Sequence, residues 1–250
     1  MARIAYDTTD AAAFEATRHL AEDGLTAWRA AVTRHLDPQH GMRVLDLGAG
    51  TGSWARSFTT WFPGIEVVAV EPSEAMRARS VFHPVVAGDA ARIPLDDGSV
   101  DAAWISTVIH HVPDLSTAAH ELSRVLRPGA PVLIRSAFAG RHQAITLFRF
   151  FPEAIRVLDT YPSVAEVEAG FATAGFAAAC LEQVPQVTAA SLREAATTIR
   201  REAHTPLQLI TAEEYALGVA RLREAAQVEA GPVVDALDLL VLRLPGRTAA

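Results

Sequence analysis

Lysine and asparagine are absent from this 250-residue sequence, and cysteine occurs once. Without lysine the chain cannot form a Schiff base. A single cysteine, Cys180, cannot form an internal disulfide, so we expect its thiol to be a small buried hydrophobe in a reducing cytoplasm. The 22 basic residues are all arginine and are outnumbered by 29 acidic residues, which gives a formal net charge of −7. This charge argues against a nucleic-acid or anionic-membrane partner.

Long uncharged apolar runs are also missing, as is a basic-then-apolar signal pattern at the start of the sequence. These absences predict a soluble, cytoplasmic protein without a membrane partner. No histidines and acids have metal-ligand spacing, and no G-x-S-x-G element indicates a hydrolase, so we expect no metal site. The length suits one large α/β domain, which we expect to be a monomer or a homodimer.

Strand and helix patterns alternate along the sequence, which predicts a parallel sheet with helices on both faces. Two amphipathic segments come first, near 11–22 and 25–36, and an irregular segment, 138–162, interrupts the alternation. The predicted strands are 43–47, 65–71, 84–87, 102–108, 131–136, 176–184 and 234–242, and the predicted helices between them are 53–62, 74–80, 116–126, 163–174, 190–203 and 212–228.

Residues 44–52 read VLDLGAGTG, a strand that breaks into a turn with glycine at every second position. Glycine is required where the backbone has positive φ or lies against a ligand. A dinucleotide fold spaces its glycines G-x-G-x-x-G, whereas here the third glycine comes one residue early. Asp46, within the strand, would also sit poorly beside a pyrophosphate. The spacing D-x-G-x-G-x-G instead resembles the first motif of class I methyltransferases, which bind S-adenosyl-L-methionine, a cofactor without phosphate.

Acidic residues follow the next two predicted strands. Glu71 ends the second strand, 19 residues beyond Gly52, where a carboxylate can accept hydrogen bonds from both ribose hydroxyls. Its alternative role is to cap the helix that follows Pro72. Asp89 follows the third strand and can accept a hydrogen bond from an adenine amine, while the backbone of Ala90 reads the ring edge. Gly-Asp is also common in ordinary turns, so both roles of Asp89 stay open.

Two histidines, His110 and His111, come directly after the fourth predicted strand. Histidine titrates near neutral pH and can take a proton from an attacking hydroxyl or amine, so either residue is a candidate general base. Alternatively, one histidine caps the loop before Pro113 and the other packs in the core. The sequence does not distinguish between them, and Asp114 either orients its neighbour or begins the next helix.

The irregular segment 138–162 is rich in phenylalanine and follows the fifth strand. In this architecture such a segment covers the site, which favours an apolar or aromatic substrate pocket. The alternative is that these residues, at helical spacing, belong to the core. The candidate pocket residues are Phe138, His142, Phe148 and Phe151.

Taken together, the segments 44–52, 67–73, 88–90, 110–114 and 126–129 resemble the small-molecule branch of class I S-adenosyl-L-methionine-dependent methyltransferases. The resemblance implies a Rossmann-like, mostly parallel seven-stranded sheet whose last strand is antiparallel. It also implies a helical lid over 1–40 and a core over 41–250, with a cap at 138–162 and a helical insertion at 189–230. The cofactor-binding residues that it implies are Arg18, Asp46, Gly48, Ala49, Gly50, Gly52, Glu71, Pro72, Asp89, Ala90, Ser106 and Thr107.

The activity implied by this resemblance is methyl transfer to a small, partly apolar metabolite, in secondary metabolism. Base-modifying relatives carry an N/D-P-P-Y element after the fourth strand, and this sequence lacks it. The fifth strand ends in Arg135 and Ser136, where a carboxylate would have assisted deprotonation, so a general base must come from His110, His111 or segment 138–162. The alternatives are a cyclase or isomerase that retains the methyl group, a nucleotide-cofactor oxidoreductase, and a ligand sensor.

Overall fold

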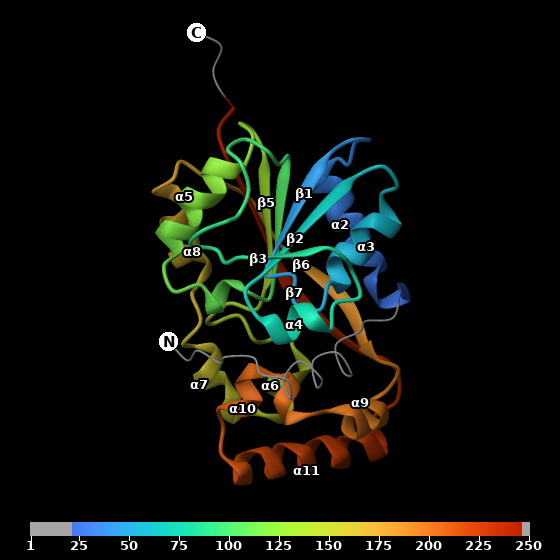
Figure 1. Ribbon diagram of the computed structural model, residues 1–250. Helices are drawn as coiled ribbons and strands as arrows, with labels where there is room; N and C mark the ends of the chain where they lie inside the picture. Colours follow the sequence, from blue (N-terminus) through green and yellow to red (C-terminus); the bar gives the residue numbers. More distant parts are fainter. Residues whose placement is uncertain (1–21, 247–250) are drawn as a thin grey trace.

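The computed structural model describes residues 22–246, and its centre is a seven-stranded β-sheet (Figure 1). The strands lie in the order β3-β2-β1-β4-β5-β7-β6, and β7 is antiparallel to both of its neighbours. This confirms the predicted fold class, including the antiparallel last strand. The strands are β1 (Arg43–Leu47), β2 (Glu66–Glu71), β3 (Val85–Ala87), β4 (Ala102–Ser106), β5 (Pro131–Ser136), β6 (Ala177–Ala189) and β7 (Val233–Arg243).

The order of the strands reverses at β1. This strand pairs in parallel with β2 on one side and with β4 on the other. The chain then continues outward in opposite directions, to β3 beyond β2 and to β5 beyond β4. Open α/β sheets bind their ligands at such a switch point, beyond the carboxyl ends of the strands. The loops after β1 and β4 are therefore the expected site.

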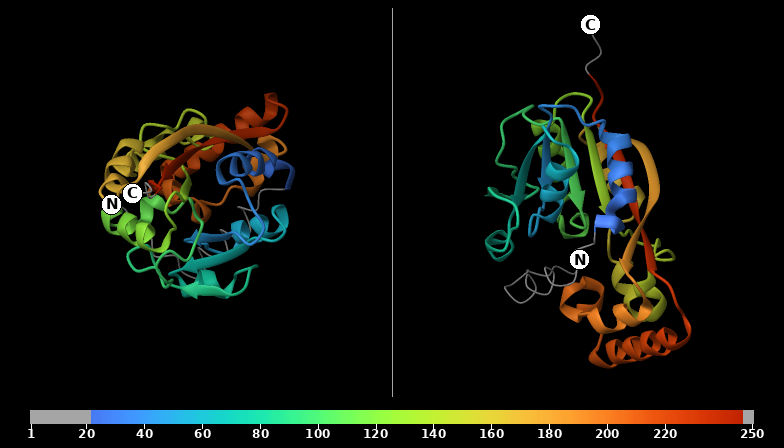
Figure 2. Two further views of the ribbon diagram at one scale, coloured as in Figure 1. Left: turned by 90° about the horizontal axis from the view of Figure 1, so that it is seen from above. Right: turned by 90° about the vertical axis from the view of Figure 1, so that its right-hand side faces the viewer.

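Helices cover both faces of the sheet (Figures 1 and 2). Helices α2 (Thr26–Leu36) and α3 (Ser53–Trp61) lie on one face, and α5 (Leu115–Val125) and α8 (Val164–Ala172) lie on the other. Because α2 packs against β5 and β6, this part of the expected 1–40 lid is a layer of the core. Arg18 lies in residues 1–21 of that lid, which are outside the described residues.

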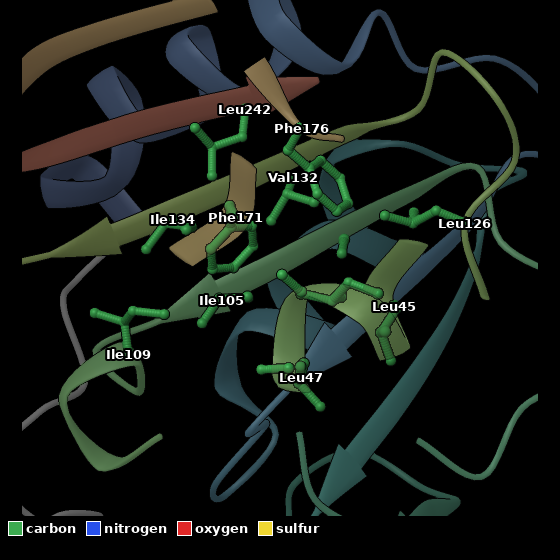
Figure 3. Close-up of a cluster of buried hydrophobic side chains, with 14 of the residues drawn as sticks. Leu45, Leu47, Ile105, Ile109, Leu126, Val132, Ile134, Phe171, Phe176 and Leu242 are labelled. Carbon is green, nitrogen blue, oxygen red and sulfur yellow. The ribbon is translucent and has the colours of Figure 1, made fainter. Parts of the chain in front are cut away.

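Two hydrophobic clusters hold these layers together. The cluster beneath α5 and α8 contains side chains from several strands, among them Leu45, Ile105 and Val132, packed against Phe171 (Figure 3). The cluster beneath α2 and α3 is aromatic, with Trp28 and Trp104 both nearly inaccessible. Each large side chain buried in this way contributes about 1.5–3 kcal/mol of transfer free energy.

A third hydrophobic cluster lies beyond the carboxyl ends of the strands, where two helical segments meet (Figure 2). The segment after β5 contains α6 (Thr146–Phe150), η3 (Pro152–Ala154) and α7 (Ile155–Leu158), so 138–162 is less irregular than predicted. The segment between β6 and β7 contains α9 (Leu192–Thr198), η4 (Arg201–Ala203), α10 (Thr205–Gln208) and α11 (Ala212–Val228). The remaining helical elements are η1 (Glu22–Leu25), α4 (Glu74–Ala78) and η2 (Ile109–His111).

Strand β6 continues five residues beyond its predicted end at Val184, through Pro185. Proline has no N–H for a central ladder, but β6 is the edge strand and pairs with β7 alone. The missing donor therefore costs no hydrogen bond within the sheet. The extension brings Gln186 to the carboxyl edge of β5.

Within residues 22–246, no helix combines the length and the apolar character that a membrane crossing requires.

Candidate active site

The loop after β1 is built on glycines in the left-handed region. Gly48 has φ of 75° and Gly52 has φ of 78°. The N–H groups of Gly48 and Ala49 both donate to the carbonyl oxygen of Val70, at 2.8 and 3.0 Å, which fixes the loop to β2. A Cβ at Gly48 would lie 2.5 Å from Cγ2 of Val108, in the loop after β4. Position 48 therefore requires glycine both for its backbone conformation and for the close approach of the two loops.

Glu71 connects this loop to the start of α4. Its Oε2 accepts a hydrogen bond from the N–H of Gly50 at 2.9 Å, and its Oε1 accepts one from the N–H of Ser73 at 2.8 Å. Burial raises the pKa of Glu71, and these two amides and the Arg77 guanidinium lower it. The cap of α4 is Ser73, whose Oγ accepts from Met76 N–H. Each carboxylate oxygen of Glu71 retains acceptor capacity, so ribose binding stays a prediction.

Asp46 is a buried carboxylate at the end of β1. Its Oδ2 has no hydrogen-bond partner among the described residues. Burial and the neighbouring charge of Glu71 raise its pKa from 3.8 to about 7, and the N–H of Ala55 lowers it. A buried carboxylate in this state is stabilised by a cationic ligand. The ammonium group of an amino-acid ligand is a cation of the required kind.

Asp89 lies after β3, on the same edge of the sheet as Glu71. Its Oδ1 accepts hydrogen bonds from the N–H groups of Ala91 and Arg92, at 2.9 and 3.0 Å. This is the geometry of an Asx turn, the alternative role that the sequence left open. Asp89 is exposed and Ala90 is partly exposed. Contact with adenine stays a prediction for both residues, as ribose contact does for the exposed Pro72.

A cavity of about 500 Å³ extends from the glycine loop to the helical segments beyond the sheet. Its inner wall includes Gly48, Ser106 and Thr107, and its outer wall includes Phe148 and Phe151. Thr107 has φ of 55°, a strained value for a non-glycine residue, and its N–H donates to the carbonyl oxygen of Arg135 at 2.7 Å. The site thus joins the loops after β1 and β4 to an aromatic wall.

The structure separates the two candidate histidines. His110 lines the cavity, and its ring stacks on Tyr161 with centroids 4.0 Å apart and an interplanar angle of 4°. His111 contacts the ring of His110 but does not line the cavity. Asp114 accepts hydrogen bonds from two N–H groups in the first turn of α5, so it begins that helix. Of the two histidines, His110 has the position of a candidate general base.

Two of the four predicted pocket residues line the cavity, Phe148 and Phe151. Phe138 does not, because it is fully buried in the cluster beneath α5 and α8. His142 packs edge-on against Phe148, with centroids 6.2 Å apart, and lies outside the lining. The prediction was therefore wrong in placing Phe138 and His142 in the pocket wall. Spacing along the sequence did not reveal which face of each short segment is turned toward the sheet.

Sequence reasoning missed the polar group on the inner wall. Arg135, at the end of β5, is only 7% exposed, and its NH2 donates to Oε1 of Gln186 at 2.7 Å. Its guanidinium carbon lies 4.9 Å from the ring centroid of Trp28 and 5.2 Å from that of Trp54. The available signal was an arginine that follows four apolar residues in the strand PVLIRS. Its partner Gln186 is 51 residues away in sequence, so no local pattern connects the two.

Two other polar groups lie apart from the glycine loop. His35, Cys180 and Glu182 bring candidate metal-ligand atoms within 4.8 Å of one another. Arg34 already contacts both carboxylate oxygens of Glu182, at 2.8 Å each, so a metal ion would have to compete with a guanidinium. Cys180 is partly exposed, not fully buried as expected. A groove of about 620 Å³ between α9 and α11 includes no residue of the glycine loop.

Comparison with known proteins gives a family match over the part of the chain that forms β1 to β5. Residues 45–134 match the model of a methyltransferase domain, which confirms the resemblance that the motifs indicated. Demethylmenaquinone methyltransferase of Corynebacterium kroppenstedtii is 36% identical over 113 residues, which are 44% of this chain and 48% of that protein. The chain thus spans about half the length of the curated relatives it matches.

Solved structures resemble nearly the whole chain at lower identity. A candidate methyltransferase from an antibiotic biosynthesis pathway of Anabaena variabilis has a TM-score of 0.65 at 22% identity, covering 86% of this chain and 95% of its own. The [4+2]-cyclase SpnF has a TM-score of 0.60 at 18% identity, and the match covers 92% of this chain and 84% of SpnF. Phosphoethanolamine N-methyltransferase 2 of Haemonchus contortus, in complex with S-adenosyl-L-methionine, has a TM-score of 0.60 at 21% identity. The match covers 96% of this chain and 58% of that protein. These similarities establish the fold alone.

Proposed function

We propose, from the premise that residues 45–134 form a methyltransferase domain, that this protein transfers a methyl group from S-adenosyl-L-methionine to a small, partly apolar acceptor. The observation that carries the proposal is the cavity of about 500 Å³, because one continuous space connects the glycine loop with an aromatic wall. A methyl donor on the loop and an acceptor against the wall would meet there.

The buried polar atoms suit this cofactor. Asp46, whose Oδ2 has no partner within the described residues, would hold the ammonium of the methionine part. Glu71 would hold the ribose, and Asp89 with Ala90 would contact the adenine. Glu71 ends β2, and the other two residues follow the neighbouring strand β3 at the same sheet edge. A dinucleotide would place a pyrophosphate near two buried carboxylates, which disfavours an oxidoreductase.

The cofactor supplies an already activated methyl group, so the chain's main task is to hold the acceptor in line with it. Fixing two reactants at attack distance contributes about 7–11 kcal/mol toward the barrier. We assign proton removal from the acceptor to the imidazole of His110, which lines the cavity and is held by Tyr161. A hydroxyl acceptor requires this step more than a neutral amine does.

We infer a small metabolite as the acceptor, of the kind found in secondary metabolism. Three features support this choice: the net charge of −7, the missing N/D-P-P-Y element and the apolar outer wall of the cavity. A macromolecular substrate would require a basic or extended surface at the mouth of the site. The attacked atom is an oxygen, nitrogen or carbon of that metabolite.

The test begins with calorimetry of the purified protein and S-adenosylhomocysteine, followed by mass analysis of products from an acceptor screen. Binding together with a product that has gained a methyl group supports the proposal. Binding with turnover of an acceptor whose mass is unchanged would identify a cyclase or isomerase. The absence of both a heat of binding and a thermal shift would contradict the proposal. A nicotinamide cofactor that binds in place of S-adenosylhomocysteine would identify an oxidoreductase.

A further inference from the structure

Three arginines line the groove of about 620 Å³ between α9 and α11, two helices that pack against each other (Figure 1). Arg193 lies on α9, Arg200 follows the end of that helix, and Arg223 lies on α11. All three residues are exposed, and within residues 22–246 no acidic residue lines the groove. The groove is thus a cluster of positive charge on a chain with a formal net charge of −7.

These arginines differ from others in the two helical segments. Three of the others pair with carboxylates: Arg149 with Glu229, Arg156 with Glu214, and Arg221 with Glu153. Across residues 22–246, the side chains of Arg193 and Arg223 form no hydrogen bond or ion pair. Arg200 donates from NH1 to the carbonyl oxygens of Thr197 and Ile199, at 2.8 and 2.9 Å, and these neutral acceptors leave its charge in place. The groove therefore has guanidinium donors available to an anion.

The acidic residues closest in sequence lie outside the groove. Glu194 follows Arg193, and its Oε2 accepts a hydrogen bond from the N–H of Ala190 at 2.6 Å, at the start of α9. Glu202 and Glu224 are exposed and do not line the groove. At physiological ionic strength, exposed charges more than about 8 Å apart are largely screened from one another. The arginines in the groove therefore act on a bound anion more strongly than the net charge of the whole chain does.

The floor of the groove is apolar. Ala196, Val219 and Ala226 line it and are buried or partly buried, whereas the arginines at its rim are exposed. Tyr215 also lines the groove. Burial raises the pKa of its phenol, as does Glu202, and the neighbouring guanidinium groups lower it. The phenol is therefore protonated at neutral pH and can donate a hydrogen bond to an anion.

The groove lies next to the large cavity but is a separate space. Ile199 lines both. The ring of Tyr215 stacks on that of Phe151, a residue of the cavity wall, with centroids 5.7 Å apart and an interplanar angle of 24°. A ligand in the groove would thus be separated from the cavity by a single layer of side chains.

From this geometry we infer that the groove binds a phosphate monoester of an apolar compound, with the phosphate at Arg193 and Arg223 and the apolar body on the floor. A phosphate monoester carries a charge of about −1.5 to −2 at neutral pH and three acceptor oxygens, which suits several guanidinium groups and a phenol. Contact of the apolar body with the floor removes apolar surface from water. The groove is not the proposed acceptor site, so the inference does not rest on the proposed function.

The test titrates three probes separately into the purified full-length protein by calorimetry: 1-naphthyl phosphate, 1-naphthol and inorganic phosphate. An exposed ion pair contributes up to about fivefold in affinity, so two arginines should make 1-naphthyl phosphate bind about 25-fold more tightly than 1-naphthol. It should also bind more tightly than inorganic phosphate, which has no apolar body. Arg193→Met and Arg223→Met should each weaken binding of 1-naphthyl phosphate about fivefold and leave binding of 1-naphthol unchanged.

Arg149→Met is the matched control. It removes the same charge from the same helical segments, at an arginine that pairs with Glu229 and does not line the groove. This variant should bind 1-naphthyl phosphate as the native protein does. A loss in Arg149→Met as large as in the two groove variants would overturn the inference, because the effect would then follow overall charge.

A further variant keeps the inference testable if the arginine variants do not fold. Gln227→Glu keeps all three arginines and adds a carboxylate to the groove, so it should weaken binding of 1-naphthyl phosphate about fivefold. Equal affinities of the native protein for 1-naphthyl phosphate and either of the other probes would overturn the inference, as would unchanged affinity in all the groove variants. A separate titration with S-adenosylhomocysteine tests the proposed function, and its result does not alter the outcome for the groove.

Discussion

Two regions of the chain, one before and one after residue 136, build their parts of the site in different ways. Residues 43–136, from β1 to β5, contribute a glycine loop fixed to Val70 and single polar side chains at the strand ends, such as Asp46 and Glu71. Residues 137–246 contribute mainly side chains, from helical segments with a hydrophobic cluster of their own. The family match, residues 45–134, falls within the first region and ends two residues before it does.

This difference shows which part of the molecule is tied to a motif and which part is free to vary. A site made from backbone depends on φ angles and close approaches, so its sequence is restricted to glycine and a few small or acidic residues. A site made from packed side chains tolerates many combinations of apolar residues, provided that their total side-chain volume stays the same. We therefore expect substitutions in the glycine loop and its nearby acidic residues to affect the cofactor, and substitutions in the second region to affect the acceptor.

The largest effect is expected from Gly48→Ala. The new Cβ would lie 2.5 Å from Val108 at a φ of 75°, so the loop must move. Strain and overpacking together cost a few kcal/mol, which corresponds to a loss of roughly 1,000-fold in S-adenosylhomocysteine affinity by calorimetry. Gly98→Ala is the control, because Gly98 also has positive φ but nothing lies within 4 Å of a Cβ there. Normal affinity in Gly48→Ala would show that the loop does not define the cofactor site.

The next effect concerns the boundary between the regions, where His110 meets Tyr161. His110→Ala should lower kcat by about 100-fold with a hydroxyl acceptor, as expected for removal of a general base. Cofactor affinity should change little. His111→Ala provides the comparison, since His111 does not line the cavity. Similar kcat values for both variants and the native protein would remove His110 from the mechanism.

A smaller effect is expected at Asp46, where cofactor affinity and the free energy of unfolding should depend on pH in opposite directions. The pKa of this carboxyl is raised from 3.8 to about 7 in the folded protein, so the folded state binds more protons than the unfolded state between these values. The free energy of unfolding of the cofactor-free protein should therefore fall as the pH rises from 4 to 7 and then level off. The affinity for S-adenosylhomocysteine should increase as the pH rises toward 7, because the Asp46 carboxyl group ionises over that range.

Asp46→Asn should flatten both pH dependences. It should also stabilise the cofactor-free protein above pH 7, by about 1–2 kcal/mol in chemical denaturation, while it weakens S-adenosylhomocysteine binding by about tenfold. This opposite change in stability and binding distinguishes a ligand-binding carboxylate from a structural one. Parallel losses in both quantities would contradict the assignment.

The smallest effect is expected in the second region, from Gly218→Ala on α11. A Cβ there would lie 2.1 Å from Cδ1 of Phe151, which lines the cavity. Shifting this ring should weaken acceptor binding about fivefold and lower the free energy of unfolding by about 1–3 kcal/mol. The affinity for S-adenosylhomocysteine should not change. The exposed Ala216→Ser on the same helix should have no measurable effect. A change in cofactor affinity in Gly218→Ala would show that the two regions are not independent.

Sequence reasoning succeeded where local chemistry decides the structure. The strands at 43–47 and 131–136 and the helix at 212–228 have the bounds that were predicted. It was less successful where distant segments meet. Phe138 is a core residue because the chain after β5 first passes beneath α5 and α8 before it reaches the cavity. Arg135 and Gln186 come together only because β6 continues through Pro185 at the sheet edge.

The sequence by itself determined the order of strands and helices, the switch point and the glycine loop with its nearby acidic residues. Each of these depends on residues within a few positions of one another, through hydrophobic periodicity, turn chemistry and allowed φ angles. Only the tertiary structure decided that His110, rather than His111, faces the cavity and that a guanidinium and an amide line its inner wall. These contacts join residues far apart in the chain, and only the packing of the sheet against the helical segments brings them together.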